Sequence, residues 1–514
     1  MVTFTPLVLK DLQMADKSTA KTTTAESIAN TFEWLITAFV LAFVFRAFVL
    51  EAFRIPTGSM ADTLMGDHFQ VCCTQCGYPY EYNFNPYIAK NYKTIADRGL
   101  YRLLPSPRCP SCGYYENPNT LVPKSNGDRI LVFKCLYQFV EPKRWDVIVF
   151  KNPTEPGINY IKRLIGKPGE TVEVIDGDIY IDGKLQRKPT KVQEEMWMCV
   201  YNNDYQPVRK TESRFNEHSW HQPFTNDIDS QWKYNPAEPT KFTLQIPANK
   251  INIMVYDTNK GNDFRAVYAY GDPRYYKNIP YCSDLMMNYY AAFDSEQGSV
   301  GIGLKKYETL YKANVDSAGV MIIEKIGAAG KTMQLARGKT SLPAKGKSFF
   351  VKFANVDHQL IFEVAQEKIV YDIGISKDDA GGRSAEIAPK ALIFGTGSLT
   401  LNHIALYRDI NYLSTRPDTR MPVDRAGEGN PFTLGKDEFF AMGDNSPDSA
   451  DSRLWSIEGI GNNGISYRMG VVPRDYLIGK AFFVYWPSGF RLEKLKLGVV
   501  PNMGKLRFIY GGVE

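Results

Sequence analysis

The sequence predicts a mainly β protein that follows one membrane-spanning helix near its N-terminus. Aromatic residues make up 13% of the chain, with 31 Tyr and 29 Phe, and these residues favour strands. Short apolar segments separated by turn-forming residues recur after residue 120. A single apolar run, beginning at Trp34, is long enough to cross a bilayer. A chain of 514 residues has room for two to four domains.

The first segment of the chain predicts a tail and an anchor. Residues 1–30 are polar and are expected to be flexible, and residues 31–53 form the predicted transmembrane anchor. Trp34 suits one membrane interface. Two alternatives are a cleaved signal peptide, for which Phe53-Arg54-Ile55-Pro56 is a poor processing site, and a buried core helix. The charges of the first 30 residues do not decide the orientation.

A cysteine-rich insertion is predicted at 72–120. Two C-x-x-C pairs lie in it, Cys73 with Cys76 and Cys109 with Cys112, each followed by Gly. Paired C-x-x-C segments are typical of a structural, closed zinc site in a zinc-ribbon-like module. Disulfides, which an extracytoplasmic location would favour, and unliganded thiols are the alternatives.

The remaining chain is interpreted as one discontinuous β-domain interrupted by a second insertion. The β-domain consists of 54–71, 121–190 and 430–514. Residues 191–429 are predicted to form an inserted β-sandwich, because strand signals recur there at regular spacing; they include Lys241–Ile246, Ser348–Phe353, Gln359–Val364 and Ser398–Tyr407. The patches at Phe353–Val364 and Ser398–Asp409 are similar to the closing strands of a concanavalin-like jelly roll.

Composition excludes some functions. The net charge of +5 is too small on this length to favour nucleic acid as a partner. The five histidines, His68, His218, His221, His358 and His403, form no H-E-x-x-H motif, so a zinc protease has no support.

Three segments carry the chemistry. Ser59 lies in Arg54–Met60, directly after the anchor, and a serine needs a nearby base to become a nucleophile. Lys162 lies in the apolar segment Tyr160–Gly166, where burial would lower its pKa. Strand alternation places Tyr160, Lys162 and Leu164 on one face and directs Arg163 to solvent. Gly443–Arg453 is a dense polar turn.

These three segments, in this order behind an anchor, resemble bacterial type I signal peptidase, a membrane-bound Ser/Lys endopeptidase. The resemblance covers about 33–71, 121–185 and 433–490, less than half of the chain. It implies that Ser59 is the nucleophile and Lys162 the general base. It further implies that the hydroxyl of Thr57 adds an oxyanion donor and that the hydroxyl of Ser449 orients the lysine amine.

The resemblance also aligns Asp451 and Arg453 with an ion pair that braces the site, and places Asp444 in the same turn. It implies cleavage after small residues in an Ala-x-Ala pattern, by way of an acyl-enzyme and without a cofactor. The expected partners are precursor proteins that carry signal peptides and the lipid bilayer; the sequence does not name a ligand for the sandwich. The expected location is the inner (plasma) membrane, with one span and an extracytoplasmic catalytic domain. The alternative is a membrane-tethered binding scaffold whose protease domain is inactive.

Overall fold

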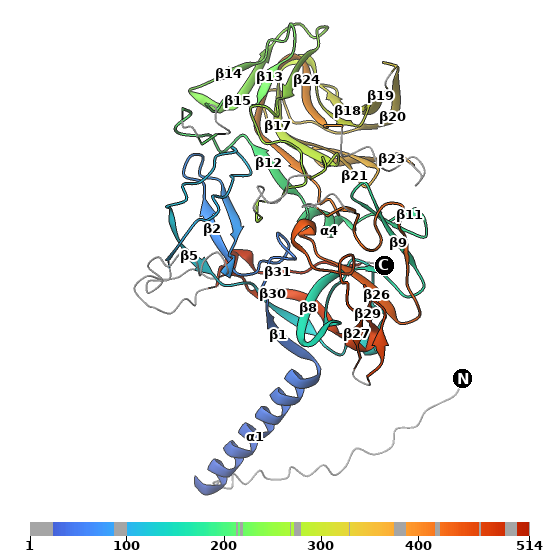
Figure 1. Cartoon of the computed structure of the whole chain (residues 1–514). Coiled ribbons are helices and arrows are strands. Elements are labelled where there is room, and N and C mark those ends of the chain that lie inside the picture. The colour runs from blue at the N-terminus through green and yellow to red at the C-terminus, as the bar shows by residue number, and fades with distance from the viewer. Residues whose placement is uncertain are drawn as a thin grey trace, which may run out of the picture. The chain divides into compact units, whose positions relative to one another are not determined.

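A computed structural model describes residues 24–512 except 87–99, 212–213, 216–218, 268, 272–278, 328, 375–386, 417–421, 462–463 and 489–500. The chain divides into two units, Met1–Glu51 and Ala52–Glu514. Nearly all regular structure outside the first unit is β, so the predicted mainly β class is confirmed (Figure 1).

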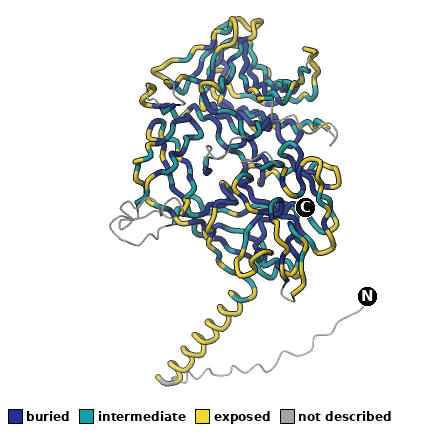
Figure 2. The backbone as a smooth tube through the Cα atoms, in the orientation of Figure 1, coloured by how far each residue is buried: buried dark blue, intermediate teal, exposed yellow. Residues whose placement is uncertain are grey.

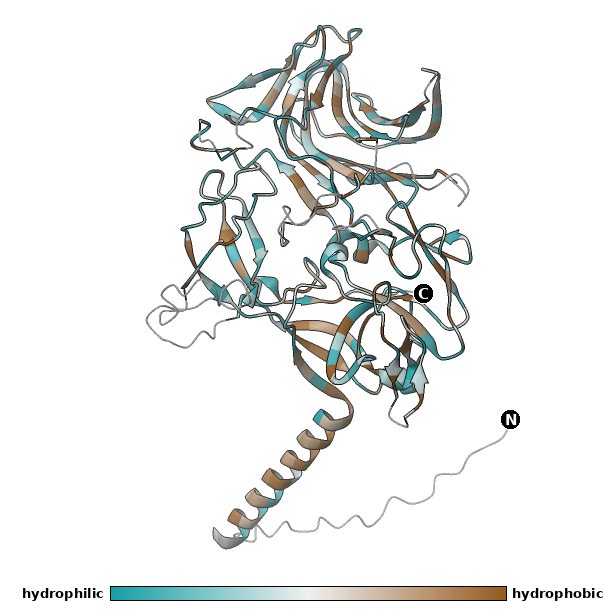
Figure 3. Ribbon diagram, viewed as in Figure 1, coloured by the Kyte–Doolittle hydropathy of each residue, from teal (hydrophilic) through white to brown (hydrophobic). Residues whose placement is uncertain are grey.

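The first unit contains one long helix, α1 (Thr24–Phe48). Its segment Glu26–Phe48 is long and apolar enough to cross a membrane, and none of it is buried (Figures 2 and 3). The helix begins before the predicted anchor 31–53 and ends before Phe53, because Leu50–Arg54 forms strand β1. Residues 24–30, predicted as tail, are therefore helical, and Glu26 in the first turn suits the positive end of the helix dipole. The predicted tail otherwise falls on residues 1–23, outside the described residues.

An eight-stranded sheet and a four-stranded sheet lie in the part of the chain that carries the candidate site. The larger sheet has the order β1-β6-β30-β7-β8-β26-β29, and β31 pairs with β30. The smaller sheet has the order β11-β10-β9-β25. Their bounds, after β1, are β6 (Arg129–Phe133), β7 (Val147–Asn152), β8 (Glu155–Gly166), β9 (Thr171–Ile175), β10 (Asp178–Ile181), β11 (Lys184–Leu185), β25 (Phe432–Thr433), β26 (Glu438–Met442), β29 (Val472–Pro473), β30 (Leu477–Trp486) and β31 (Arg507–Phe508).

The second half of strand β8, residues 162–166, is buried on both faces. Leu164 packs in one core cluster with Ile148 and Phe150, and Ile165 packs in another with Trp145. A strand with two buried faces has no solvent side, which decides where the charged side chains of β8 can point. Short elements complete this region: α3 (Leu136–Phe139), α4 (Thr190–Glu195), the hairpin β27 (Gly459–Ile460) with β28 (Ser466–Tyr467), and 3-10 turns at Ser446–Asp448, Arg474–Tyr476 and Met503–Lys505.

The cysteine-rich segment builds a separate sheet of four strands. Its order is β3-β2-β5-β4, with bounds β2 (His68–Cys72), β3 (Pro79–Asn83), β4 (Leu100–Arg102) and β5 (Leu121–Ser125). Strands β2 and β5 were assigned by sequence to the other β-domain. Strand β2 leads into the first C-x-x-C turn and pairs with β3, which follows that turn, and β2 also pairs with β5. The sheet therefore extends beyond 72–120 on both sides.

The second insertion forms a 13-stranded assembly that two bent strands divide into two layers. Strands β17 (Leu285–Lys306) and β24 (Lys390–Arg408) pair along most of their length, with a register shift between Asn288 and Tyr290 and a wider break between Phe293 and Gly298. Before this break β17 also pairs with β21, and after it with β18. Side chains from both layers share one core, Ile302 and Ile323 with Val351 and Phe362. The domain is therefore a β-sandwich.

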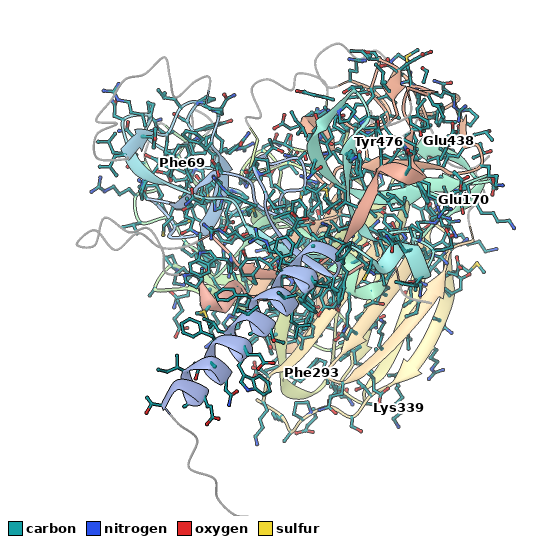
Figure 4. All side chains as sticks on the ribbon, turned by 90° about the horizontal axis from the view of Figure 1, so that it is seen from below. Phe69, Glu170, Phe293, Lys339, Glu438 and Tyr476 are labelled. Atoms are coloured by element: carbon teal, nitrogen blue, oxygen red, sulfur yellow. The ribbon has the colours of Figure 1, made fainter. Side chains whose placement is uncertain are left out.

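The other strands of this assembly are β12 (Met198–Asn202), β13 (Phe224–Asn226), β14 (Lys233–Asn235), β15 (Glu238–Gln245), β16 (Asn252–Tyr256), β18 (Thr309–Asp316), β19 (Val320–Ile326), β20 (Thr332–Lys339), β21 (Phe349–Val356), β22 (Gln359–Val364) and β23 (Glu367–Asp372). Figure 4 labels side chains from each part of Ala52–Glu514: Phe69 from the cysteine-rich sheet, Phe293 and Lys339 from the sandwich, and Glu170, Glu438 and Tyr476 from the remaining body. The predicted domain boundaries stay predictions.

Candidate active site

Ser59 lies in a tight turn that follows β1. Ala61 N–H donates to Gly58 O at 3.0 Å and Leu64 N–H donates to Met60 O at 2.8 Å, so the backbone around Ser59 forms a hydrogen-bonded turn. Ser59 is only 9% exposed. We call Gly58–Met65 the nucleophile turn. Its compactness holds the hydroxyl in one place inside the body.

Lys162 on β8 reaches the hydroxyl of Ser59. Its Nζ donates to Ser59 Oγ at 2.6 Å and to Ile161 O at 3.2 Å, and the ring of Tyr160 lies 5.2 Å from the amine. Lys162 is 4% exposed. Burial lowers its pKa from 10.5 to about 8, while the carboxylates of Asp451 and Asp444 act in the opposite direction. An amine in this range is neutral in a useful fraction near neutral pH and can accept the serine proton.

The turn Gly443–Arg453 donates hydrogen bonds to backbone carbonyls of the nucleophile turn. Asn445 N–H donates to Ser59 O at 3.1 Å, and Asn445 Nδ2 donates to Gly58 O at 3.1 Å. A Cβ on Gly443 would lie 2.4 Å from Ser59 O, so only glycine permits this close approach. Sequence reasoning did not give Asn445 a role; its backbone N–H and its side-chain amide fix the carbonyls of Ser59 and Gly58.

Asp451 and Arg453 form the predicted ion pair inside this turn. Arg453 Nη2 lies 2.8 Å from Asp451 Oδ2, and both side chains are buried. Burial alone would raise the pKa of Asp451, but the guanidinium of Arg453 and the N–H of Gly443 hold it below its ordinary value. Ser449 is also buried in this turn. The role of Ser449 in orienting the lysine amine stays a prediction.

Arg163 corrects one expectation. Strand alternation directed it to solvent, yet it is 0% exposed, because the second face of β8 meets a core cluster and not water. Its Nε and Nη2 donate to the two carboxylate oxygens of Asp444 at 2.8 and 2.7 Å. Asp444 therefore has a defined partner: the pair joins the strand that carries Lys162 to the turn that grips Ser59.

Thr57 lies on the approach to the nucleophile turn, and its side chain is exposed. An exposed hydroxyl two residues before Ser59 can face an incoming substrate. Its part in an oxyanion hole stays a prediction.

The four cysteines of the two C-x-x-C pairs converge. Their sulfur atoms all lie within 4.8 Å of one another, with 3.7 Å between Cys73 and Cys112 Sγ and 3.6 Å between Cys76 and Cys109 Sγ. These separations exceed a disulfide bond of about 2.05 Å. They suit four thiolates around one Zn²⁺ at about 2.3 Å each.

The two C-x-x-C turns have the same backbone geometry. Gly77 N–H donates to Cys73 O and Gly113 N–H to Cys109 O, at 2.9 and 3.0 Å. Both glycines have positive φ, 77° and 79°, a conformation that favours glycine. Two matched turns that point their sulfurs at one centre form a donor set that fits a metal ion, and Cys72, which is exposed, is not part of it.

Comparisons with known proteins agree with this geometry. The family model "Signal peptidase, peptidase S26" matches residues 118–268 and 405–486, which contain Lys162 and the turn Gly443–Arg453 but begin after Ser59. Signal peptidase I of Rickettsia canadensis is 30% identical over 36% of this chain and 54% of its own. Signal peptidase I of Rickettsia akari is 31% identical over 30% of this chain and 44% of its own.

The chain thus spans about half the length of the curated relatives that it matches. The expected resemblance to type I signal peptidase is confirmed, and together with α1 it supports a membrane-anchored protein. Among solved structures, a carbohydrate-binding module from Bacillus subtilis covers 36% of this chain and 95% of its own at 10% identity, with a TM-score of 0.25. A TM-score that low supports no conclusion about the sandwich.

Proposed function

We propose that this protein is a membrane-bound serine endopeptidase that removes N-terminal signal peptides from exported precursor proteins. The observation that carries the proposal is the buried contact of 2.6 Å between Lys162 Nζ and Ser59 Oγ. A nucleophile within hydrogen-bond reach of a base that burial keeps partly neutral is the arrangement that acyl transfer requires. The resemblance to Signal peptidase I supplies the substrate class.

The reaction proceeds in two acyl-transfer steps. The neutral amine of Lys162 takes the proton of Ser59 as Oγ attacks the scissile carbonyl, and the ammonium then gives that proton to the leaving amine. The signal peptide remains bound to Ser59 as an ester. Lys162 next takes a proton from water, whose oxygen attacks the ester, and the ammonium returns that proton to Ser59 Oγ as the peptide leaves.

The developing oxyanion needs donors, and we assign them to Ser59 N–H and the hydroxyl of Thr57. Losing one such donor typically costs ~2.7–4 kcal/mol of transition-state stabilisation. Cleavage follows small residues in an Ala-x-Ala pattern. We assign the protein to the inner (plasma) membrane, with α1 as a single span and the catalytic domain outside the cytoplasm, where exported precursors emerge.

Cleavage of a precursor with an Ala-x-Ala site tests the proposal. The full chain in detergent should release a product whose new N-terminus follows the second Ala, and both Ser59→Ala and Lys162→Ala should lose this activity while they keep the wild-type far-UV spectrum. Lys436→Ala, at an exposed lysine, is the matched control and should cleave normally. Cleavage that survives in Ser59→Ala would exclude the mechanism. A wild type that cleaves no precursor would favour the binding-scaffold alternative.

A structural Zn²⁺ is the second part of the proposal. Four thiolates leave no open coordination position, so the metal would fold the cysteine-rich module and take no part in the chemistry. Cys73, Cys76, Cys109 and Cys112 would hold it. Elemental analysis of the purified chain should find one Zn per chain; a metal-free chain with two disulfides at these cysteines would contradict the assignment.

A further inference from the structure

A tyrosine from the sandwich insertion packs directly against the nucleophile turn. The ring of Tyr270 is 0% exposed and forms a small core of its own with Ala61 and Met65. Its hydroxyl donates to Asp67 O at 3.2 Å, and its carbonyl accepts from Asn83 N–H at 2.9 Å. Tyr270 is therefore fixed by its ring, its hydroxyl and its backbone.

The ring occupies the space beside the residue that precedes Ser59. A Cβ on Gly58 would lie 2.0 Å from Cε1 of Tyr270 and 2.8 Å from its Cζ. Gly58 does not adopt a positive φ, so the ring, not the backbone conformation, is what excludes a side chain here. Tyr270, more than 200 positions further along the chain, is thus the reason that position 58 must be a glycine.

The described residues 262–267 and 269–271, which we call the strap, have their first residue, Asn262, fixed on the cysteine-rich module. Asn262 Nδ2 donates to Pro110 O at 2.7 Å, to Val200 O at 3.1 Å and to Cys109 O at 3.3 Å. The next part of the strap pairs with the returning chain, since Cys282 N–H donates to Phe264 O at 2.8 Å. The strap runs from the second C-x-x-C turn to the nucleophile turn.

Tyr270 and the turn Gly443–Arg453 act on the nucleophile turn through different contacts. Asn445 fixes the two carbonyls of Gly58 and Ser59 by hydrogen bonds, whereas Tyr270 supplies only apolar contact to Gly58 and its neighbours. Glycine is the residue with the most backbone freedom. A filled space beside Gly58 therefore removes alternative conformations that would turn Ser59 Oγ away from Lys162.

We propose that Tyr270 is a positioning residue, which holds the nucleophile turn so that Ser59 faces Lys162 and makes catalysis depend on the inserted domain. This inference rests on the proposed peptidase function. A displacement of about 1 Å at a reacting group can cost about 100-fold in rate. We therefore expect an effect on kcat and little effect on KM, because the ring is buried under the turn.

Steady-state cleavage of an Ala-x-Ala precursor by the full chain tests the inference. Tyr270→Ala should lower kcat by about 10-fold to 100-fold with KM within about twofold, whereas Tyr270→Phe, which keeps the ring, should stay within a few-fold of wild type. Tyr290→Ala, at an exposed tyrosine of the sandwich (42%), is the matched control and should behave as wild type. Equal kcat in Tyr270→Ala and wild type would overturn the inference and leave the proposed function intact.

Two further readouts separate positioning from loss of fold. Gly58→Ala should be strongly impaired, and the double variant Gly58→Ala/Tyr270→Ala should be more active than Gly58→Ala alone, because the clash is gone; a double variant no better than Gly58→Ala would contradict the geometry. Hydrogen exchange of the backbone amides of Ala61 and Leu64 should be faster in Tyr270→Ala than in Tyr290→Ala. Unchanged exchange would overturn the inference even if the wild type proved to have no peptidase activity.

Discussion

The pH dependence of the reaction follows from the burial of Lys162. Its pKa is lowered from 10.5 to about 8, which makes the charged form less stable by roughly 3 kcal/mol than in water. The general base must be neutral, so activity is lost as the pH falls through this pKa and reaches a plateau above it. The neutral fraction is about one tenth at pH 7, one half at pH 8 and nine tenths at pH 9.

The measurement is kcat/KM between pH 6 and pH 10, which reports the pKa of the free enzyme. The substrate is a blocked Ala-x-Ala peptide without His, Cys, Lys or Tyr, so that only the enzyme titrates. We expect an acid limb of unit slope with a midpoint near pH 8, and a rise of about tenfold from pH 7 to pH 9. Enzyme returned to pH 8 after incubation at each pH should recover full activity.

An unperturbed lysine would give a different curve. With the ordinary pKa of 10.5, kcat/KM would rise about 100-fold between pH 7 and pH 9 and would not reach a plateau by pH 10. That result, or an acid limb centred near pH 4 to 5, would refute the assignment of Lys162 as a buried base.

Three further predictions follow from the same contacts. Lys162→Met should raise the free energy of unfolding at pH 7 by up to ~3 kcal/mol, because the wild type buries a charged amine at that pH. The pKa of Lys162 is lower in the folded state than in the unfolded state, so the wild type regains this stability as the pH rises from about 8 to 10.5. A gain that denaturant titration finds equal at pH 7 and pH 10.5 would contradict the prediction. Asp444→Asn leaves the buried guanidinium of Arg163 without its carboxylate and should lower the free energy of unfolding by ~3–5 kcal/mol. Asp372→Asn, in an exposed pair, should lower it by ~1 kcal/mol or less. Equal losses in the two variants would refute the argument from burial. Cys109→Ser should lose the bound Zn²⁺ and lower the melting temperature, and full Zn²⁺ retention by elemental analysis would exclude this ligand.

Much of the site is visible in the sequence because its residues lie in short motifs. Ser59, Lys162 and the turn Gly443–Arg453 each stand in a local context that resembles one family, and the structure brings all three together. The paired cysteines are equally local, because each C-x-x-C with its glycine defines its own turn. The sequence does not show how close the two turns lie; the structure brings their four sulfur atoms together.

Two features that the sequence did not predict depend on contacts between distant segments. The burial of Arg163 follows from the second face of β8 being covered, which strand alternation cannot reveal. The contact of Tyr270 with Gly58 joins positions that lie far apart in the sequence, and no local pattern marks this tyrosine among 31. The end of α1 at Phe48 was missed because apolar residues continue into β1.

The central claim is that Ser59 carries the acyl group. The most direct measurement is the intact mass of the full chain, quenched with acid during turnover of an Ala-x-Ala precursor and then mapped by peptide digestion. We predict an added mass equal to that of the free signal-peptide fragment less one water, as an ester requires, located on Ser59 and absent from Ser59→Ala. Turnover without any such adduct at Ser59, or an adduct on another residue, would contradict the account.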